Sequence, residues 1–149
     1  MKAVWPAIAL VAFGLAGCSQ PSPVGKWDAN IEAQGKQLPA VVEFKSDNTA
    51  TWDISVPKQE MGPVSVESFH ILASGTWKAD GTKFSSTVTD LKLSDGAPDM
   101  IKSAFELGKK QITEQMNKAR SATLAYKESG AMEMTTPDGV VTTYVKHKG

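Results

Sequence analysis

Apolar and polar residues alternate along most of the chain from Val24 onward. In the first such stretch, Trp27, Ala29 and Ile31 alternate with charged or amide side chains. A period of two residues places apolar side chains on one face of a β-strand and polar side chains on the other. The same pattern, interrupted by turn residues, predicts seven or eight strands, at residues 26–33, 41–45, 50–56, 66–78, 84–93, 122–127, 131–135 and 140–146.

Most of the predicted strands are joined by short turns. Ala79-Asp80-Gly81 is a strong hairpin signal, whereas residues 57–65 form a longer connection with two prolines. Successive strands with short turns indicate an antiparallel meander, and a long meander protects its edge strands best by closing or nearly closing. The pattern therefore predicts a mainly β fold, a small barrel that is closed or partly open.

The period changes from two to that of a helix between residues 98 and 120. The apolar residues on this stripe are Ile101, Ala104, Phe105, Ile112, Met116 and Ala119, together with Gly108. This spacing predicts one long amphipathic helix before the last strands. We interpret Gly108 as the point where the helix closely approaches the sheet, so Gly108→Leu should destabilise the fold.

The first 17 residues have a different character from the rest of the chain. Thirteen of them are hydrophobic, and they follow a positive start at Lys2. A transmembrane helix needs about 20 apolar residues, so this run is short for a permanent span. A positive start, a brief apolar core and small residues before a break are typical of an export signal.

The residues that end this segment, Leu15-Ala16-Gly17-Cys18, resemble the lipobox of bacterial lipoproteins. The resemblance implies that residues 1–17 are a signal peptide that is cut off before Cys18. It also implies that the Cys18 thiol receives a diacylglyceryl group and that its new amino end is acylated. Two or more acyl chains give stable membrane anchoring. Residues 18–23 would then be the lipidated cysteine and its tether, and residues 24–149 the folded domain. Ser19 implies the outer membrane, on its periplasmic face, in an organism that has one.

Composition narrows the class of protein. The 149 residues fit a single domain, and 16 basic and 16 acidic residues give a formal charge of zero. Nucleic-acid binders normally carry a basic excess, so we expect no nucleic-acid partner. The single cysteine excludes an intramolecular disulfide and a multi-thiolate zinc site.

Two tripeptides in the predicted strands carry a second resemblance. Gly25-Lys26-Trp27 opens the first strand, and Gly75-Thr76-Trp77 repeats its pattern. A G-x-W at the start of the first strand is similar to lipocalins and related calycin barrels, in which the tryptophan closes one end of the barrel. The chain differs from them in its short length and in its helix before the final strands, which favours a small barrel. Such a barrel is filled by its own side chains or holds one small ligand.

Three tryptophans are candidates for a ligand site. Trp27, Trp52 and Trp77 each lie on the apolar side of a predicted strand, where core packing is the alternative interpretation. Met132 and Met134 share one strand face, which suits Cu(I) or an apolar core, and we expect no metal and no cofactor. Only His70 and His147 could serve as imidazole bases, and neither falls in a recognisable catalytic motif.

The sequence thus predicts a membrane-anchored protein of the cell envelope that is not an enzyme. Its leading function is to bind a small apolar ligand or another envelope protein. One alternative is an interaction, inhibitor or assembly module with a filled barrel, in which exposed residues 58–65 would contact the partner. A hydrolase that uses carboxylates on the barrel rim is the other alternative.

Overall fold

The computed structural model of the chain describes residues 21–33, 36–118 and 121–148. The predicted signal peptide and Cys18 lie outside these residues. The elements are β1 (Gly25–Ala33), β2 (Lys36–Phe44), β3 (Thr49–Val56), β4 (Gln59–Met61), β5 (Val64–Val66), β6 (Phe69–Asp80), β7 (Lys83–Leu93), α2 (Asp99–Lys118), β8 (Ser121–Tyr126), β9 (Met132–Thr135) and β10 (Val141–Lys146).

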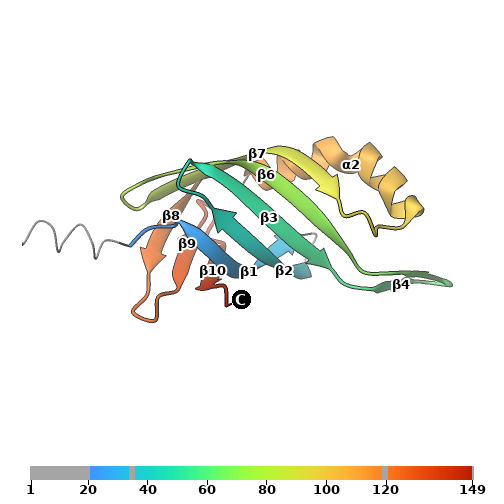
Figure 1. Ribbon diagram of the computed structural model, residues 1–149, viewed down its shortest axis with the longest axis horizontal. Coiled ribbons are helices and arrows are strands. Elements are labelled where there is room, and N and C mark those ends of the chain that lie inside the picture. Colours follow the sequence, from blue (N-terminus) through green and yellow to red (C-terminus); the bar gives the residue numbers. More distant parts are fainter. Residues whose placement is uncertain (1–20, 34–35, 119–120, 149) are drawn as a thin grey trace, which may run out of the picture.

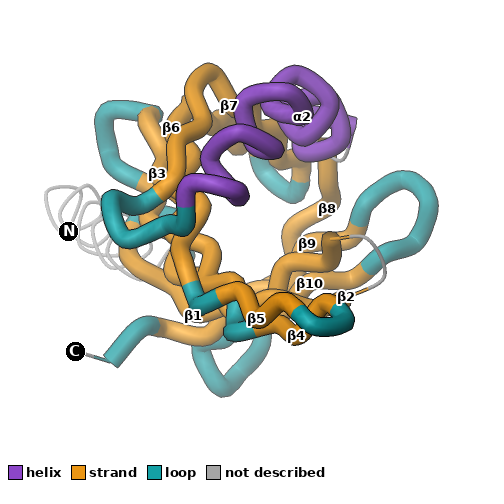
Figure 2. The backbone as a smooth tube through the Cα atoms, turned by 90° about the vertical axis from the view of Figure 1, so that its right-hand side faces the viewer, coloured by secondary structure: helices purple, strands orange, loops and turns teal. Residues whose placement is uncertain are grey.

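In the described part of the chain, eight strands close into one antiparallel barrel (Figure 1). Their order around the barrel is β1-β10-β9-β8-β7-β6-β3-β2, so each strand pairs with its neighbours along the chain and β10 closes on β1. Seen from the end that bears the β4–β5 hairpin, the strands form a ring with α2 along one side (Figure 2). The predicted meander of seven or eight strands with one helix before the last strands is confirmed, and the barrel is closed.

A small hairpin replaces part of the predicted connection at residues 57–65. β4 and β5 pair with each other in a separate two-stranded sheet that projects beyond one end of the barrel (Figure 1). The predicted strand at 66–78 is accordingly divided, with Val66 in β5, residues 67–68 between the strands and residues 69–78 in β6. Strands of three residues are too short to show an alternating pattern, which explains why the sequence predicted only a loop.

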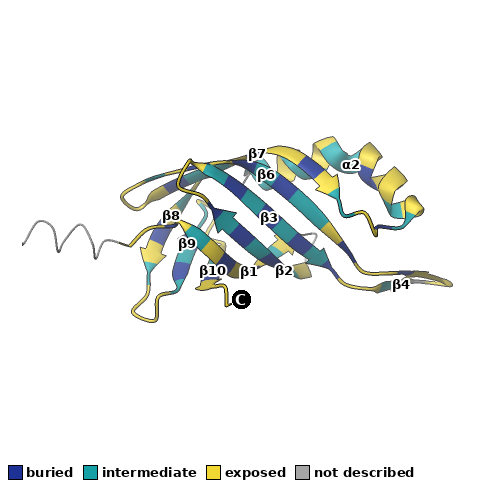
Figure 3. Ribbon diagram, in the orientation of Figure 1, coloured by how far each residue is buried: buried dark blue, intermediate teal, exposed yellow. Residues whose placement is uncertain are grey.

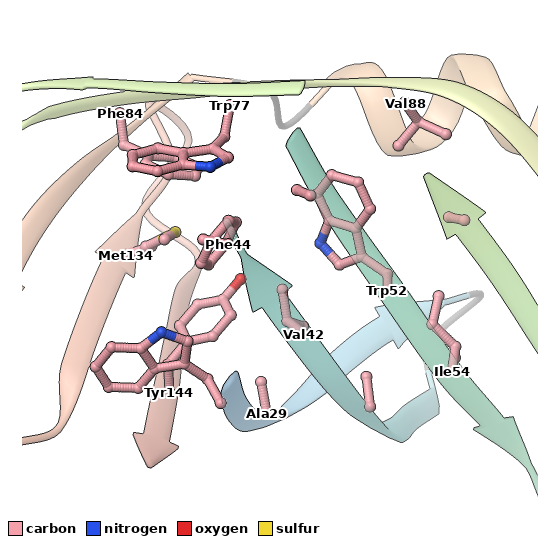
Figure 4. Close-up of a cluster of buried hydrophobic side chains, with 14 of the residues drawn as sticks. Ala29, Val42, Phe44, Trp52, Ile54, Trp77, Phe84, Val88, Met134 and Tyr144 are labelled. Carbon is pink, nitrogen blue, oxygen red and sulfur yellow. The ribbon is translucent and has the colours of Figure 1, made fainter. Parts of the chain in front are cut away.

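The inward-facing side chains form a large core cluster, and Val56, Val66, Phe69 and Ala97 form a second, smaller cluster. Buried positions recur along the strands at every second residue or so (Figure 3). Phe44 lies at the centre of the large cluster and contacts four other aromatic rings in tilted or edge-on arrangements (Figure 4). Ring-centroid distances from Phe44 are 5.3 Å to Phe84, 5.7 Å to Trp77, 6.2 Å to Tyr144 and 6.4 Å to Trp52. These distances lie in the range where aromatic pairs add to the hydrophobic stabilisation.

Helix α2 packs one apolar stripe against β7 and the barrel core. Phe105 is buried, and Ile112 and Met116 are half-buried against the same core, as the helical spacing predicted. The interpretation of Gly108 is wrong, because a Cβ atom built there meets no atom within 4 Å. The helix touches the barrel through its long side chains, so the backbone at Gly108 stays clear of the sheet. No helix in the described ranges has the length and apolar character needed to span a bilayer.

Candidate ligand cavity

The barrel and the helix enclose a cavity of about 400 Å³. Its inner wall is apolar, with Phe44, Trp52, Ile54, Phe84 and Met134 contributed by four different strands. Ile112 and Met116 of α2 close the side where β8 is short. The volume is within the range of about 300–1,000 Å³ that is typical of small-molecule pockets.

The mouth of the cavity is formed by lining residues that face solvent, namely Glu32, Gln115, Thr136, Asp138 and Val140. Glu32 lies at the end of β1, Gln115 on α2, and the other three in or beside the β9–β10 turn. The β3–β6 connection, which carries the β4–β5 hairpin, leaves the barrel at this same end. The cavity therefore opens at the end of the barrel from which the hairpin projects.

The opposite end of the barrel is sealed by two tryptophans. The Trp27 indole Nε1–H donates a hydrogen bond of 2.8 Å to the carbonyl of Pro23, and Lys146 Nζ lies 4.1 Å from the centre of the same ring. The Trp77 indole Nε1–H donates to the carbonyl of Lys45 at 2.9 Å, which fixes the β2–β3 turn to β6. We call this end, with residues 23–27, 45–48 and Trp77, the closed end.

The three candidate tryptophans therefore occupy two different environments. Trp52 lines the cavity, 6% exposed, whereas Trp27 and Trp77 are not among the lining residues and pack at the closed end. Alternation along a strand identifies inward-facing residues, but it does not separate those that fill the barrel from those that border a space. Whether an inward-facing residue fills the barrel or borders the cavity depends on how far along the barrel axis each strand extends.

Sequence reasoning missed Tyr144, which also lines the cavity. Tyr144 is 7% exposed on β10, and its hydroxyl group lies among the aromatic side chains beside Phe44 (Figure 4). Burial alone raises the pKa of this phenol to about 12, because the phenolate would lose its hydration. Tyr144 shares the inward face of β10 with Thr142, whereas the apolar Val141 and Val145 lie on the exposed face, so alternation along this strand gave no signal for it.

Within the described ranges, both charged residues that line the cavity are acidic. Glu32 and Asp138 lie at the mouth, and no lysine, arginine or histidine of these ranges is among the lining residues. The Asp138 carboxylate accepts a hydrogen bond from the Thr136 hydroxyl group, which fixes it on the β9–β10 turn. The mouth therefore carries a negative charge.

The two histidines lie on the outer surface of the barrel. His70 Nδ1 is 2.6 Å from Asp53 Oδ1, and His147 Nδ1 is 2.7 Å from Asp28 Oδ1. Both pairs are well exposed and neither borders the cavity. Within the described ranges, no three His, Cys, Asp or Glu side chains are grouped as a metal would require. Met132 and Met134 are both buried in the barrel core.

No protein-family model matches this chain, and no curated protein matches its sequence. The class that the structure defines is thus a closed, eight-stranded antiparallel barrel with one helix, an architecture consistent with a lipocalin-like barrel.

Proposed function

We propose that this chain is a lipid-anchored protein of the cell envelope whose barrel binds a small apolar molecule without chemically changing it. The observation that carries the proposal is the cavity of about 400 Å³ with an apolar inner wall. A barrel of eight strands is wide enough to be filled by side chains or to hold one small ligand. A space of this size, next to a core that is otherwise densely packed, favours the second alternative.

The anchor in this proposal is the lipid on Cys18, supported by the lipobox Leu15-Ala16-Gly17-Cys18. Its location would be the outer membrane, on the periplasmic side, in an organism with two membranes. Cys18→Ala should release the protein from the membrane fraction, because the acyl chains provide the anchor. Retention of the Cys18→Ala protein in the membrane fraction through its N-terminal segment would contradict lipidation.

Ligand binding is tested by blocking the cavity from the helix. Ile112→Trp adds a large side chain at a half-buried lining position, whereas Leu107→Trp adds the same side chain at a position of α2 that is 90% exposed and outside the cavity. We expect small apolar molecules to be extracted from the purified wild-type protein and from Leu107→Trp. Ile112→Trp should lose most of them, as measured by mass spectrometry of the organic extract.

The opposite result would favour the protein-interaction alternative. The observation that supports this alternative is the projecting β4–β5 hairpin, on which Val64 is 42% exposed. If no small molecule is extracted and an envelope protein co-purifies instead, Val64→Lys should abolish that co-purification. In that case the cavity-blocking variant would bind the partner as wild type does.

A further inference from the structure

The cavity combines an apolar wall with two polar features that the proposed function does not yet use. One is the Tyr144 hydroxyl group deep in the barrel, and the other is the pair of carboxylates at the mouth, Glu32 and Asp138. Tyr144 on β10 lies four positions after Val140 at the mouth, which corresponds to about 13 Å along an extended chain. The two features are thus at different depths.

Tyr144 is a buried polar side chain without a protein partner. No hydrogen bond joins its hydroxyl group to another described residue, and burial is the sole cause of its altered acidity. No fully occluded side-chain oxygen in the described residues is unpaired, so this hydroxyl group must retain some access to the cavity space. A buried hydroxyl group without a partner is costly, and it both donates and accepts hydrogen bonds.

The mouth, by contrast, carries two acidic side chains. Glu32 and Asp138 are both exposed lining residues, and among the residues that the structure describes no cationic side chain lines the cavity to balance a bound anion. A carboxylate ligand would meet repulsion at the mouth, and in the interior it would lose hydration without gaining an ion pair. Binding of an anion is therefore disfavoured whether its charged end stays at the mouth or enters the interior.

We propose that the cavity takes neutral or cationic amphiphiles and rejects those with a carboxylate end. A neutral ligand enters with its polar end first and hydrogen-bonds to the Tyr144 hydroxyl group. A cationic ligand enters with its apolar end first and leaves its charge beside Glu32 and Asp138. This inference rests on the proposed function, because it specifies the ligand of the same cavity.

Three probes with the same ten-carbon chain test the inference: decan-1-ol, decylamine and decanoate, all at pH 7.5. The full chain is held on phosphatidylcholine vesicles, and binding to protein-free vesicles is subtracted from each isotherm. We expect decylamine and decanol to bind, and decanoate to bind about tenfold more weakly than decylamine, with the difference shrinking in high salt.

Two sets of variants assign the selectivity to its residues. Glu32→Gln combined with Asp138→Asn should weaken the binding of decylamine and strengthen the binding of decanoate, while the binding of decanol is unchanged. The control is Glu60→Gln combined with Glu114→Gln, which removes two exposed carboxylates outside the cavity lining. Tyr144→Phe should weaken the binding of decanol about fivefold, because the hydrogen bond from decanol to the Tyr144 hydroxyl group is lost. The binding of decylamine should be nearly unchanged.

The outcomes separate this inference from the proposed function. If none of the three probes binds, both fail. If all three bind equally well, or decanoate binds best, the cavity still binds apolar ligands and only the charge selection is overturned. If decanoate binds weakly but the double variant at the mouth leaves all three affinities unchanged, the assignment to Glu32 and Asp138 is overturned.

Discussion

At the scale of single residues, the two G-x-W tripeptides need their glycines for different reasons. Gly25 has a φ of +136°, a backbone conformation that side chains with a Cβ atom rarely adopt. Gly75 lies at an irregularity in the β6–β7 pairing, where a Cβ atom would overlap the carbonyl oxygen of Thr87. Each glycine thus allows a local backbone arrangement that a larger residue would disturb, and the tryptophan two residues later follows from that arrangement.

Gly75→Ala should lower the free energy of unfolding by about 2 kcal/mol, because the Cβ atom forces β6 and β7 apart. The matched control is Gly108→Ala, at a helix position where an added Cβ atom meets nothing within 4 Å. That variant should stabilise the fold by up to about 1 kcal/mol through helix propensity. Denaturant unfolding of the two variants measures both values, and equal effects would contradict the different roles of these glycines.

The acidity of Tyr144 gives a second prediction at this scale. Its pKa is raised to about 12 in the folded chain from an ordinary value of 10.0. Above pH 10 the unfolded chain loses the phenol proton while the folded chain keeps it. The free energy of unfolding should therefore fall between about pH 10 and pH 12, by at most about 1.4 kcal/mol per pH unit.

Denaturant unfolding at pH 9 and pH 11 measures this dependence. Tyr144→Phe should lose less stability between these two values than the wild type, because phenylalanine does not titrate. The half-buried Tyr126, whose pKa is also raised by burial, is present in both proteins, so its contribution cancels in the comparison. Parallel curves for the two proteins would show that Tyr144 is not buried from water in the folded chain.

At the scale of elements, helix α2 completes the barrel next to the start of β8. β8 pairs with β7 only at Lys83, Phe84 and Ser85, so no strand of the described ranges lies beside the rest of that β7 edge. The Asn117 side chain takes the place of a strand there. Its Oδ1 atom accepts a hydrogen bond from Val88 N at 2.9 Å, and its Nδ2 atom donates to Val88 O at 3.4 Å.

Asn117→Ala should lower the free energy of unfolding by about 1–2 kcal/mol, because it leaves the Val88 backbone groups unpaired. Hydrogen exchange at the Val88 amide should also become faster. Gln111→Ala, at an exposed position of the same helix, is the control and should change neither quantity. Unchanged exchange at Val88 in Asn117→Ala would show that the amide side chain does not protect this edge.

Asn117 also shows which features of these elements the sequence could not predict. Helical spacing identified Phe105, Ile112 and Met116 because burial of one stripe is a local property of a helix. It could not identify Asn117, because a free β7 edge exists only once β8 has paired with β7 over three residues. For the same reason the strand pattern placed Trp52 inside the barrel, but the cavity that Trp52 lines depends on the register of several strands at once.

At the scale of the whole molecule, the mouth and the start of the described chain lie at opposite ends of the barrel (Figure 1). Pro23 and Val24 contact Trp27 and Lys146 at the closed end. Three residues along the chain separate Cys18 from Pro21, which corresponds to about 11 Å at most. A lipid on Cys18 would therefore hold the closed end near the membrane and direct the mouth away from it.

Fluorescent labels on introduced cysteines test this orientation, because the proposed lipidation of Cys18 would consume the single native thiol. Ser46→Cys labels the exposed β2–β3 turn at the closed end, and Pro137→Cys labels the exposed β9–β10 turn at the mouth. On vesicles that contain a headgroup-attached quencher, the label at residue 46 should be strongly quenched and the label at residue 137 only weakly. Equal quenching would mean that the tether lets the barrel tumble, and stronger quenching at residue 137 would mean that the mouth faces the bilayer. With the mouth directed away from the membrane, ligands would enter the barrel from the aqueous side, and the acidic residues Glu32 and Asp138 would meet them first.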